Sequence, residues 1–359
     1  MLNEASILEA LKGVKYPGYS RDIVSFGLVK QAAAASGAVS VAIELTSPNA
    51  EMAVQIKTEC ERALRALPGV SAVHVEVKAA PGTAPRSAFA QQQKIPGIAR
   101  VVAVASGKGG VGKSTCSVNL ACTLAQLGLR VGLLDCDIYG PSIPRMMALS
   151  GRPETADGKT MIPMENYGVR VMSIGFLVDE DTPMIWRGPM VMGAIEQMLR
   201  DVRWGELDVL VCDLPPGTGD AQLTMAQRVP LSGAVIVSTP QDIALLDAVR
   251  GINMFRKVDV PVLGLIENMS YFVCPHCGGR SEIFHHGGAK ATAAKLGVEF
   301  LGEIPLDIEI RTTSDEGRPI VAANPTGAHA KAYLAIAGRV LDVLKGGTAN
   351  RKPPRISFV

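Results

Sequence analysis

One stretch of the sequence has the residue types and spacing of a phosphate-binding loop. Residues 107–114, Gly-Lys-Gly-Gly-Val-Gly-Lys-Ser, match the pattern G-x-x-x-x-G-K-[ST] and follow an apolar run. Glycines let backbone N–H groups close around phosphate oxygens, and the positive end of a following helix attracts the same anion. Lys113 is expected to reach the β- and γ-phosphates of a nucleotide, and Ser114 to bind Mg²⁺. The residues predicted to surround the nucleotide are Gly107, Lys108, Gly109, Gly110, Val111, Gly112, Lys113, Ser114 and Thr115.

Acidic residues follow two further apolar runs. Asp135 and Asp137 come after one run, and Asp213 ends another. Open parallel sheets bind ligands beyond the carboxyl ends of their strands, so we expect these side chains beside the phosphate-binding loop. Two carboxylates at i and i+2 point the same way from the end of a strand, so one can bind Mg²⁺ or its waters while the other contacts an attacking water. Asp213 is expected to hold Mg²⁺ through water or Ser114, and Gly217 can bring a backbone N–H close to a γ-phosphate, which makes its loop a candidate switch.

A pair of cysteines, Cys274 and Cys277, has the spacing C-x-x-C in a segment rich in Gly and His. Two such thiols can turn toward one metal, but zinc and cubane iron–sulfur clusters each need four protein ligands. The preceding cysteine, Cys212, belongs to a predicted buried strand. A two-fold axis would solve the shortage by bringing both thiols of two chains to one [4Fe–4S] cluster. The spacing alone leaves open a half zinc site, a redox pair or two inert thiols.

Apolar runs of strand length alternate with helix-compatible segments over most of the chain. Several runs are continuous and rich in Val, Ile and Leu, as is typical of strands covered on both faces. This pattern predicts an α/β fold with a doubly wound, mostly parallel sheet. The expected strands are 101–106, 130–135, 169–174, 207–213, 234–239, 262–267 and 299–303.

The first 78 residues predict a separate small α+β domain. Its expected elements are a helix at 4–13, strands at 22–29 and 39–45, a helix at 50–67 and a strand at 70–77. Residues 79–97 are rich in Pro, Ala and Gln and indicate a linker. The nucleotide-binding domain is expected over 98–345, followed by a flexible basic tail at 346–359.

Composition excludes several classes of protein. The chain has 359 residues and a formal net charge of +2, which gives no broad field for nucleic acid or anionic lipid. No apolar run approaches the ~20 residues of a membrane-spanning helix, and no targeting signal is visible at the N-terminus, so the cytoplasm is the expected compartment. Seven cysteines, an odd number, do not indicate a disulfide framework.

Several motifs together resemble those of the Mrp/ApbC iron–sulfur cluster carrier ATPases, which have the deviant Walker A loop of MinD/Mrp-like P-loop NTPases. The resemblance implies that Lys108 crosses a two-fold axis to the partner's nucleotide, that Asp137 orients the attacking water, and that Asn268 pairs with the edge of adenine. Residues 1–78 are similar to the small iron–sulfur-assembly domain that often precedes such ATPases. The motifs are residues 108–114, 135–144, 186–190, 213–220, 238–242 and 267–277.

The resemblance implies a homodimeric ATPase that assembles a labile [4Fe–4S] cluster at its interface and passes it to recipient apoproteins. ATP and Mg²⁺ would be the cofactors, an upstream cluster scaffold a partner, and Lys108, Lys113 and Asp137 the catalytic residues of slow, switch-like hydrolysis. Neither nucleic acid nor a membrane is expected as a partner. Three alternatives remain open: a partition-type positioning ATPase, a nitrogenase-reductase-like electron carrier, and a zinc-bridged structural adaptor.

Overall fold

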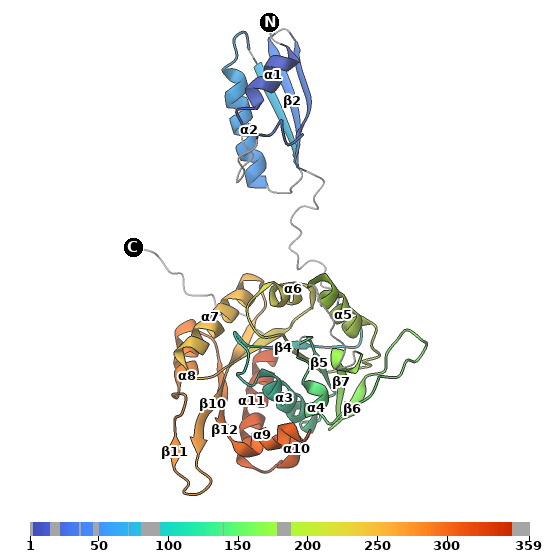
Figure 1. The fold of residues 1–359 in the computed structure, drawn as a ribbon, viewed down its shortest axis with the longest axis vertical. Helices are drawn as coiled ribbons and strands as arrows, with labels where there is room; N and C mark the ends of the chain where they lie inside the picture. Colours follow the sequence, from blue (N-terminus) through green and yellow to red (C-terminus); the bar gives the residue numbers. More distant parts are fainter. Residues whose placement is uncertain are drawn as a thin grey trace. The chain divides into compact units, whose positions relative to one another are not determined.

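The structure is a computed structural model of the chain. The residues that it describes are 3–14, 22–35, 37–45, 50–70, 72–79, 94–138, 140–177 and 188–346. The chain divides into two compact units, Met1–Gln91 and Gln92–Val359, and each is considered by itself (Figure 1). Most of the expected linker (80–93), part of the motif at 186–190, and the expected tail from residue 347 onward lie outside the described residues.

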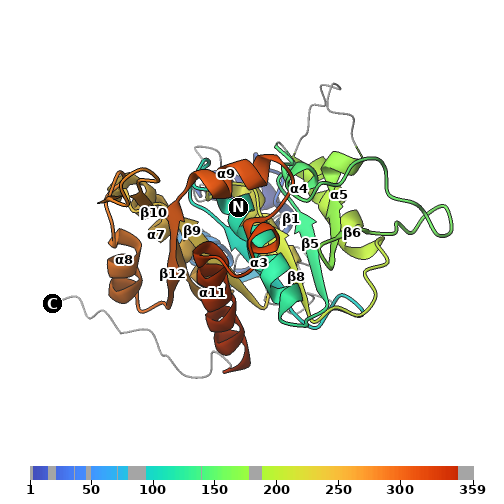
Figure 2. The same ribbon diagram turned by 90° about the horizontal axis from the view of Figure 1, so that it is seen from below.

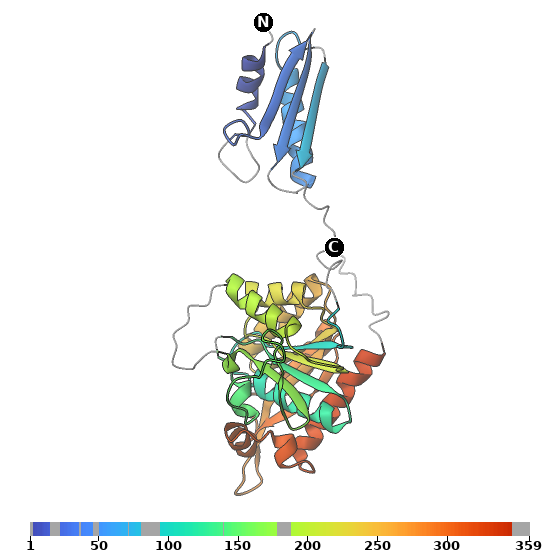
Figure 3. The ribbon, with the colours of Figure 1, turned by 90° about the vertical axis from the view of Figure 1, so that its right-hand side faces the viewer.

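Among its described residues, the first unit has a three-stranded sheet and two helices (Figure 3). Strand β2 pairs with β1 in antiparallel and with β3 in parallel orientation. Alternate residues of β2, Val39, Val41 and Ile43, are buried in one core with Ile7 of α1 and Ile56 of α2, so the same face of the sheet packs against both helices. The predicted small α+β domain is confirmed. Its elements are α1 (Glu4–Leu11), β1 (Val29–Ala35), β2 (Ala38–Leu45), α2 (Ala50–Arg65) and β3 (Ala72–Ala79).

The strand predicted over residues 22–29 is wrong. The Asp22 carboxylate accepts hydrogen bonds from the backbone N–H and the hydroxyl of Ser25, both at 2.7 Å. Gly27 has a φ of +70°, in the left-handed region. These local bonds close a turn that competes with extended pairing. The first strand therefore begins at Val29, after the turn.

The second unit is organised around one sheet, which has nine strands among the described residues. Its order is β11-β10-β9-β4-β8-β5-β7-β6, and β12 also pairs with β10. The pairs are parallel except β6–β7 and β10–β11. The strands are β4 (Val101–Ala105), β5 (Val131–Asp135), β6 (Met164–Asn166), β7 (Val169–Ser173), β8 (Val209–Asp213), β9 (Gly233–Ser238), β10 (Val262–Val273), β11 (Arg280–Ser281) and β12 (Phe300–Leu306).

Helices cover both faces of this sheet. Figure 1 shows α5, α6 and α7 on one side and α3, α10 and α11 on the other, and Figure 2 views the second group from below. Strands β4, β5 and β8 are buried along their whole length, as expected between two helical layers. The predicted doubly wound, mostly parallel fold is confirmed. The helices are α3 (Lys113–Gln126), α4 (Ile143–Met146), α5 (Gly188–Arg200), α6 (Asp220–Arg228), α7 (Asp242–Lys257), α8 (Gly288–Leu296), α9 (Ile308–Asp315), α10 (Ile320–Ala323) and α11 (Ala328–Lys345), with a 3₁₀ turn at Ile174–Phe176.

The observed sheet differs from the predicted one in two short additional strands and in the length of β10. Strands β6 and β11, of three and two residues, were not predicted because segments so short carry no periodic signal. Strand β10 was expected to end at residue 267 but continues to Val273. In the described part of the chain, no helix combines the length and the apolar character needed to cross a membrane.

Candidate functional site

The predicted phosphate-binding loop connects the end of β4 to the start of α3. Gly110 and Gly112 have φ values of +80° and +79°, which L side chains rarely adopt. A Cβ on Gly112 would also collide with the carboxamide nitrogen of Asn268. The loop borders a cavity of about 270 Å³, which Asp137 and Pro216 also line. Glycine is therefore required where the backbone approaches the cavity, as a phosphate cradle demands.

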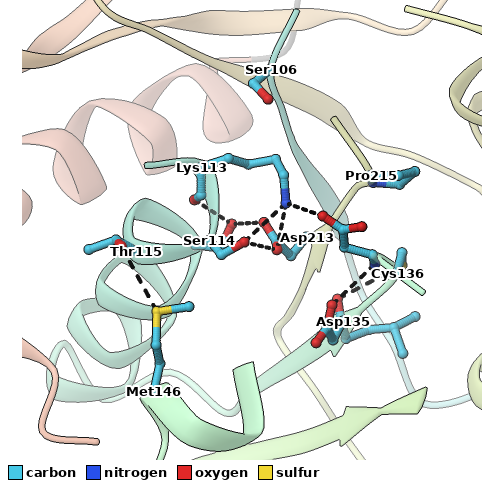
Figure 4. A network of polar contacts seen from close by, with 12 residues as sticks. Ser106, Lys113, Ser114, Thr115, Asp135, Cys136, Met146, Asp213 and Pro215 are labelled. Carbon is cyan, nitrogen blue, oxygen red and sulfur yellow. Dashed lines mark hydrogen bonds and ion pairs between the residues drawn. The ribbon is translucent and has the colours of Figure 1, made fainter. Parts of the chain in front are cut away.

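Lys113 and Ser114 converge on Asp213 at the end of this loop (Figure 4). The Lys113 ammonium lies 2.7 Å from Asp213 Oδ2, and the Ser114 hydroxyl donates to the same oxygen at 2.6 Å. Ser117, one turn further along α3, donates to Asp213 Oδ1 at 2.6 Å. Asp213 is fully buried and only 6% of the Lys113 side chain is exposed. A hydroxyl, a carboxylate and a shielded ammonium form a donor set that suits Mg²⁺ and phosphate oxygens.

The two carboxylates that follow β5 have different surroundings. Asp137 lines the cavity, with Oδ2 at 3.7 Å from the Lys113 ammonium. Asp135 is fully buried, and accepts hydrogen bonds from the Ser173 hydroxyl at 2.9 Å and the Asp137 backbone N–H at 3.1 Å. Burial and the neighbouring charge of Asp213 raise the pKa of Asp135 to about 7, and burial also raises the pKa of Asp137. The role of Asp137 in orienting water stays a prediction.

Replacing Asp135 with Asn should stabilise the fold most at alkaline pH. The folded-state pKa of Asp135 is raised from 3.8 to about 7, so the folded protein favours the protonated form, and the free energy of unfolding falls as pH rises through this interval. Asn mimics the protonated carboxyl and can still bond to Ser173 and the Asp137 N–H. We expect a gain on the order of 1–3 kcal/mol at about pH 8.5 and little change at about pH 5. Urea unfolding without nucleotide or metal measures it, and an equal gain at both pH values would contradict it.

The loop after β8 is tied to the phosphate-binding loop. The Gly217 N–H donates to the Ser106 carbonyl at 3.0 Å, and Gly217 has a φ of +105°. Gln222 of α6 donates to the Pro215 carbonyl, and the adjacent Pro216 lines the cavity. A γ-phosphate could attract the Gly217 N–H only by replacing the Ser106 carbonyl as its acceptor. The predicted contact of Gly217 with that phosphate stays a prediction.

Asn268 lies within β10 and contacts the phosphate-binding loop directly. Its side chain is buried, and Nδ2 donates to the Val111 carbonyl at 2.8 Å. A carboxamide has a second N–H and an oxygen beyond this bond. The predicted pairing of Asn268 with adenine therefore stays a prediction, while its contact with the loop is a feature that the sequence did not indicate.

Cys274 and Cys277 lie in the turn that joins β10 to β11. The turn is closed by hydrogen bonds from the Cys274 N–H to the Gly279 carbonyl and from the Gly278 N–H to the Cys274 carbonyl, both at 2.9 Å. Cys277 is exposed and Cys274 half-buried. The backbone N–H groups of His276 and Cys277 lower the pKa of Cys274 and so favour the thiolate, the form that binds metals. The remaining cysteines are all buried: Cys60, Cys116, Cys122, Cys136 and Cys212.

Some residues that shape the site were not identified from the sequence. Ser117 follows Lys113 by one helical turn, a spacing that could have indicated a shared face. Glu267 accepts hydrogen bonds from the backbone N–H groups of Gly287 and Ala289, at 2.8 and 2.7 Å, and so caps α8, a contact between distant segments that no local pattern indicates. For His286, the sequence allows either a supplementary metal ligand or a solvated loop residue; the structure places its Nε2 2.8 Å from Glu303 Oε2, so a carboxylate holds this side chain.

Comparisons with known proteins agree with these observations. Residues 97–341 match a family model described as NUBPL iron-transfer P-loop NTPase, and residues 4–77 match one described as iron–sulfur cluster assembly protein. The chain is 45% identical to the iron–sulfur cluster carrier protein of Synechocystis, over 95% of this chain and 97% of that protein. It is 59% identical to the iron–sulfur cluster transfer protein NUBPL of Dictyostelium discoideum, over 70% of this chain and 78% of that protein.

A solved structure is also similar. A nucleotide-binding protein from Archaeoglobus fulgidus in complex with ADP is 43% identical, with a TM-score of 0.57. The match covers 64% of this chain and 90% of that protein.

Proposed function

The chain belongs to the NUBPL iron-transfer P-loop NTPase family, and we propose that it is an ATP-hydrolysing carrier of a labile [4Fe–4S] cluster. One observation supports this most directly. Strand β10 connects the phosphate-binding loop to the accessible thiol pair, because Asn268 on this strand contacts the loop and Cys274 directly follows its last residue, Val273. A protein that only positions other molecules would need the first feature and not the second. The relatives of this chain in Synechocystis and Dictyostelium are named as a cluster carrier protein and a cluster transfer protein.

The nucleotide in this proposal is ATP with Mg²⁺. Ser114 and Asp213 would hold the metal, because a hydroxyl and a carboxylate are ligands that Mg²⁺ prefers. Lys113 would exchange part of its contact with Asp213 for phosphate oxygens, and Asp137 would orient the attacking water at the cavity. Bound Mg²⁺ would neutralise phosphate charge. The Archaeoglobus relative is a nucleotide-binding protein in complex with ADP, which supports nucleotide binding by this chain.

The cluster in this proposal is cargo shared by two chains. Four irons call for four ligands, and only Cys274 and Cys277 among the seven cysteines are accessible. A second copy of the chain supplies the other two thiolates, and the homodimer follows from that shortage. The two-fold axis of this homodimer would also give Lys108 a role. Its ammonium has no ion-pair partner among the described residues, and it would reach the nucleotide of the partner chain.

Sharing the ligands explains how the cluster can be released. Four thiolates divided between subunits can be parted by a change in subunit arrangement, so ATP binding and hydrolysis would favour either the holding or the releasing arrangement. Recipient apoproteins would take the cluster, and an upstream scaffold would supply it. Hydrolysis is expected to be slow, since it serves as a switch.

Anaerobic reconstitution of the full chain with iron and sulfide tests this function. We expect about two irons and two sulfides per chain, a cubane spectrum, a dimer mass, and transfer of the cluster to an iron–sulfur apoprotein that regains activity. Zinc uptake with no iron uptake, or a permanent monomer, would contradict the carrier and favour a zinc-bridged adaptor. Cluster retention with nucleotide-dependent electron donation, and no transfer, would instead indicate an electron carrier.

A further inference from the structure

The longest interruption in the pairing of strand β10 with β12 lies at residues 269–271, which we call the β10 elbow. Pairing with β12 is in register from Ile266 and Gly302 to Asn268 and Ile304, and resumes only at Phe272 and Leu306. Pro305 is the one residue of β12 opposite the elbow, and it has no N–H to donate to the ladder. Within the elbow, Met269 has a φ of +54°, a left-handed conformation that is unfavourable for a residue other than glycine. The elbow is thus a strained joint inside the strand.

Asn268, the residue immediately before the elbow, is hydrogen-bonded to the phosphate-binding loop. The Asn268 carboxamide donates to the Val111 carbonyl at 2.8 Å. The methyl group of Met269 lies close by, since a Cβ built on Gly112 would be 3.8 Å from it. The Val111 carbonyl and the Gly112 N–H belong to one planar peptide group, so they rotate together. A phosphate that draws the Gly112 N–H toward itself therefore also reorients the acceptor of Asn268.

On the other side, the elbow carries the thiol turn. Immediately beyond it, Phe272 and Val273 pair with Ser281 and Arg280 of β11, which form the hairpin that Figure 1 shows extending from the body of the unit. The Arg280 guanidinium lies 4.0 Å from the centre of the Tyr271 ring, so the elbow and the hairpin are in contact. A change of backbone angle at Met269 would therefore redirect Cys274 and Cys277.

The part of β10 that precedes the elbow is held in place, so a backbone movement would be confined to the elbow and the hairpin beyond it. The Ser270 hydroxyl donates to Glu267 Oε1 at 2.6 Å, and Glu267 in turn caps α8. From Gly264 to Glu267, β10 also pairs in register with β9, ending at Ser238. The strand before the elbow belongs to the central sheet, whereas the hairpin after it contacts the rest of the unit through the pairing of Phe272 with Leu306 and through Arg280 on Tyr271.

We propose that the β10 elbow transmits nucleotide occupancy to the thiol turn, with Asn268 as the positioning residue that connects the two. This inference rests on the proposed binding of nucleotide by the loop. It adds a route distinct from the loop after β8, which touches the phosphate-binding loop through Gly217 and Ser106. Coupling between two sites needs an element with two arrangements that both sites bias, and the strained Met269 supplies one.

Alkylation of the metal-free, reduced full chain tests the proposal, because Cys274 and Cys277 are the accessible thiols and the other five are buried. Iodoacetamide labelling of each cysteine is followed by peptide mass spectrometry, with and without saturating Mg–ADP or a non-hydrolysable ATP analogue. In the unmodified chain we expect nucleotide to change the labelling rate of the pair roughly fivefold or more. In Asn268→Ala this ratio should fall to about 1 at nucleotide saturation. Asn324→Ala, the same truncation at the end of α10, should keep the full ratio.

A second variant tests the proposal without relying on the nucleotide affinity of Asn268→Ala. Met269→Gly leaves the Asn268 bond intact and relieves the positive φ, so we expect nucleotide to bind normally while the labelling ratio falls toward 1. Retention of the full ratio in Met269→Gly or in saturated Asn268→Ala would overturn the proposal and favour the loop after β8 as the route. An unmodified chain that binds nucleotide without any change in labelling would overturn it too. Failure to bind nucleotide, measured separately by calorimetry, would contradict the proposed function instead.

Discussion

Replacing Lys113 with Ala should lower the rate of ATP hydrolysis by at least about 100-fold, because this ammonium is the cation at the end of the phosphate-binding loop. It lies 2.7 Å from Asp213 and 3.7 Å from Asp137, in a nearly solvent-free place where charge interactions are strong. Asp213 keeps its hydrogen bonds from Ser114 and Ser117, so the fold should persist. Phosphate release measures the rate, and circular dichroism checks the fold. Hydrolysis at the unmodified rate would contradict the assignment of this loop.

Lys108 offers a matched control in the same loop. Lys108→Ala should bind nucleotide normally and still lose hydrolysis, because its ammonium acts in this proposal on the partner's nucleotide. The two inactive variants should then complement each other when mixed. In a mixed dimer, the Lys108→Ala chain binds ATP through its own Lys113 and receives Lys108 from the other chain. A mixture no more active than either variant alone would contradict the action of Lys108 across the two-fold axis.

The sequence predicted the parts of the structure that local patterns determine. The phosphate-binding loop, Lys113, Ser114 and Asp213 follow from glycine spacing and from an acid at the end of an apolar strand, and the structure brings these residues together. The main strands were predictable for a related reason. A strand buried on both faces has to be apolar along most of its length, as β8 is from Val209 to Cys212, and few other segments are.

The features that the sequence did not predict depend on contacts between distant segments. The β10 elbow lies opposite Pro305 of β12, which is distant in the sequence. The raised pKa of Asp135 comes first from its burial in the folded sheet and then from the neighbouring charge of Asp213, which belongs to a different strand. The error over residues 22–29 has the opposite cause. There a local bond from Ser25 to Asp22 overrode an apolar pattern that resembles a strand.

The joint replacement Cys274→Ser and Cys277→Ser should reduce iron uptake to background while leaving nucleotide binding intact. Both residues lie in the turn between β10 and β11, outside the cavity that the phosphate-binding loop lines, so the substitution does not touch that cavity. Serine keeps the size of each side chain but removes the thiolate that iron–sulfur clusters require. Iron and sulfide counts after anaerobic reconstitution, with nucleotide titration in parallel, measure the two outcomes.

A buried cysteine supplies the control for this double variant. Cys122→Ala removes a thiol from the interior of α3, where burial raises its pKa to about 12 and keeps it protonated at neutral pH. It should therefore take up as much iron as the unmodified chain, although it is expected to lose some stability. Because no other thiol of the chain is accessible, iron bound by the double variant could not be held by cysteine in the folded protein. Equal iron uptake by the double variant and the unmodified chain would mean that the cluster is not bound at this turn, and the shared-cluster dimer would have to be abandoned.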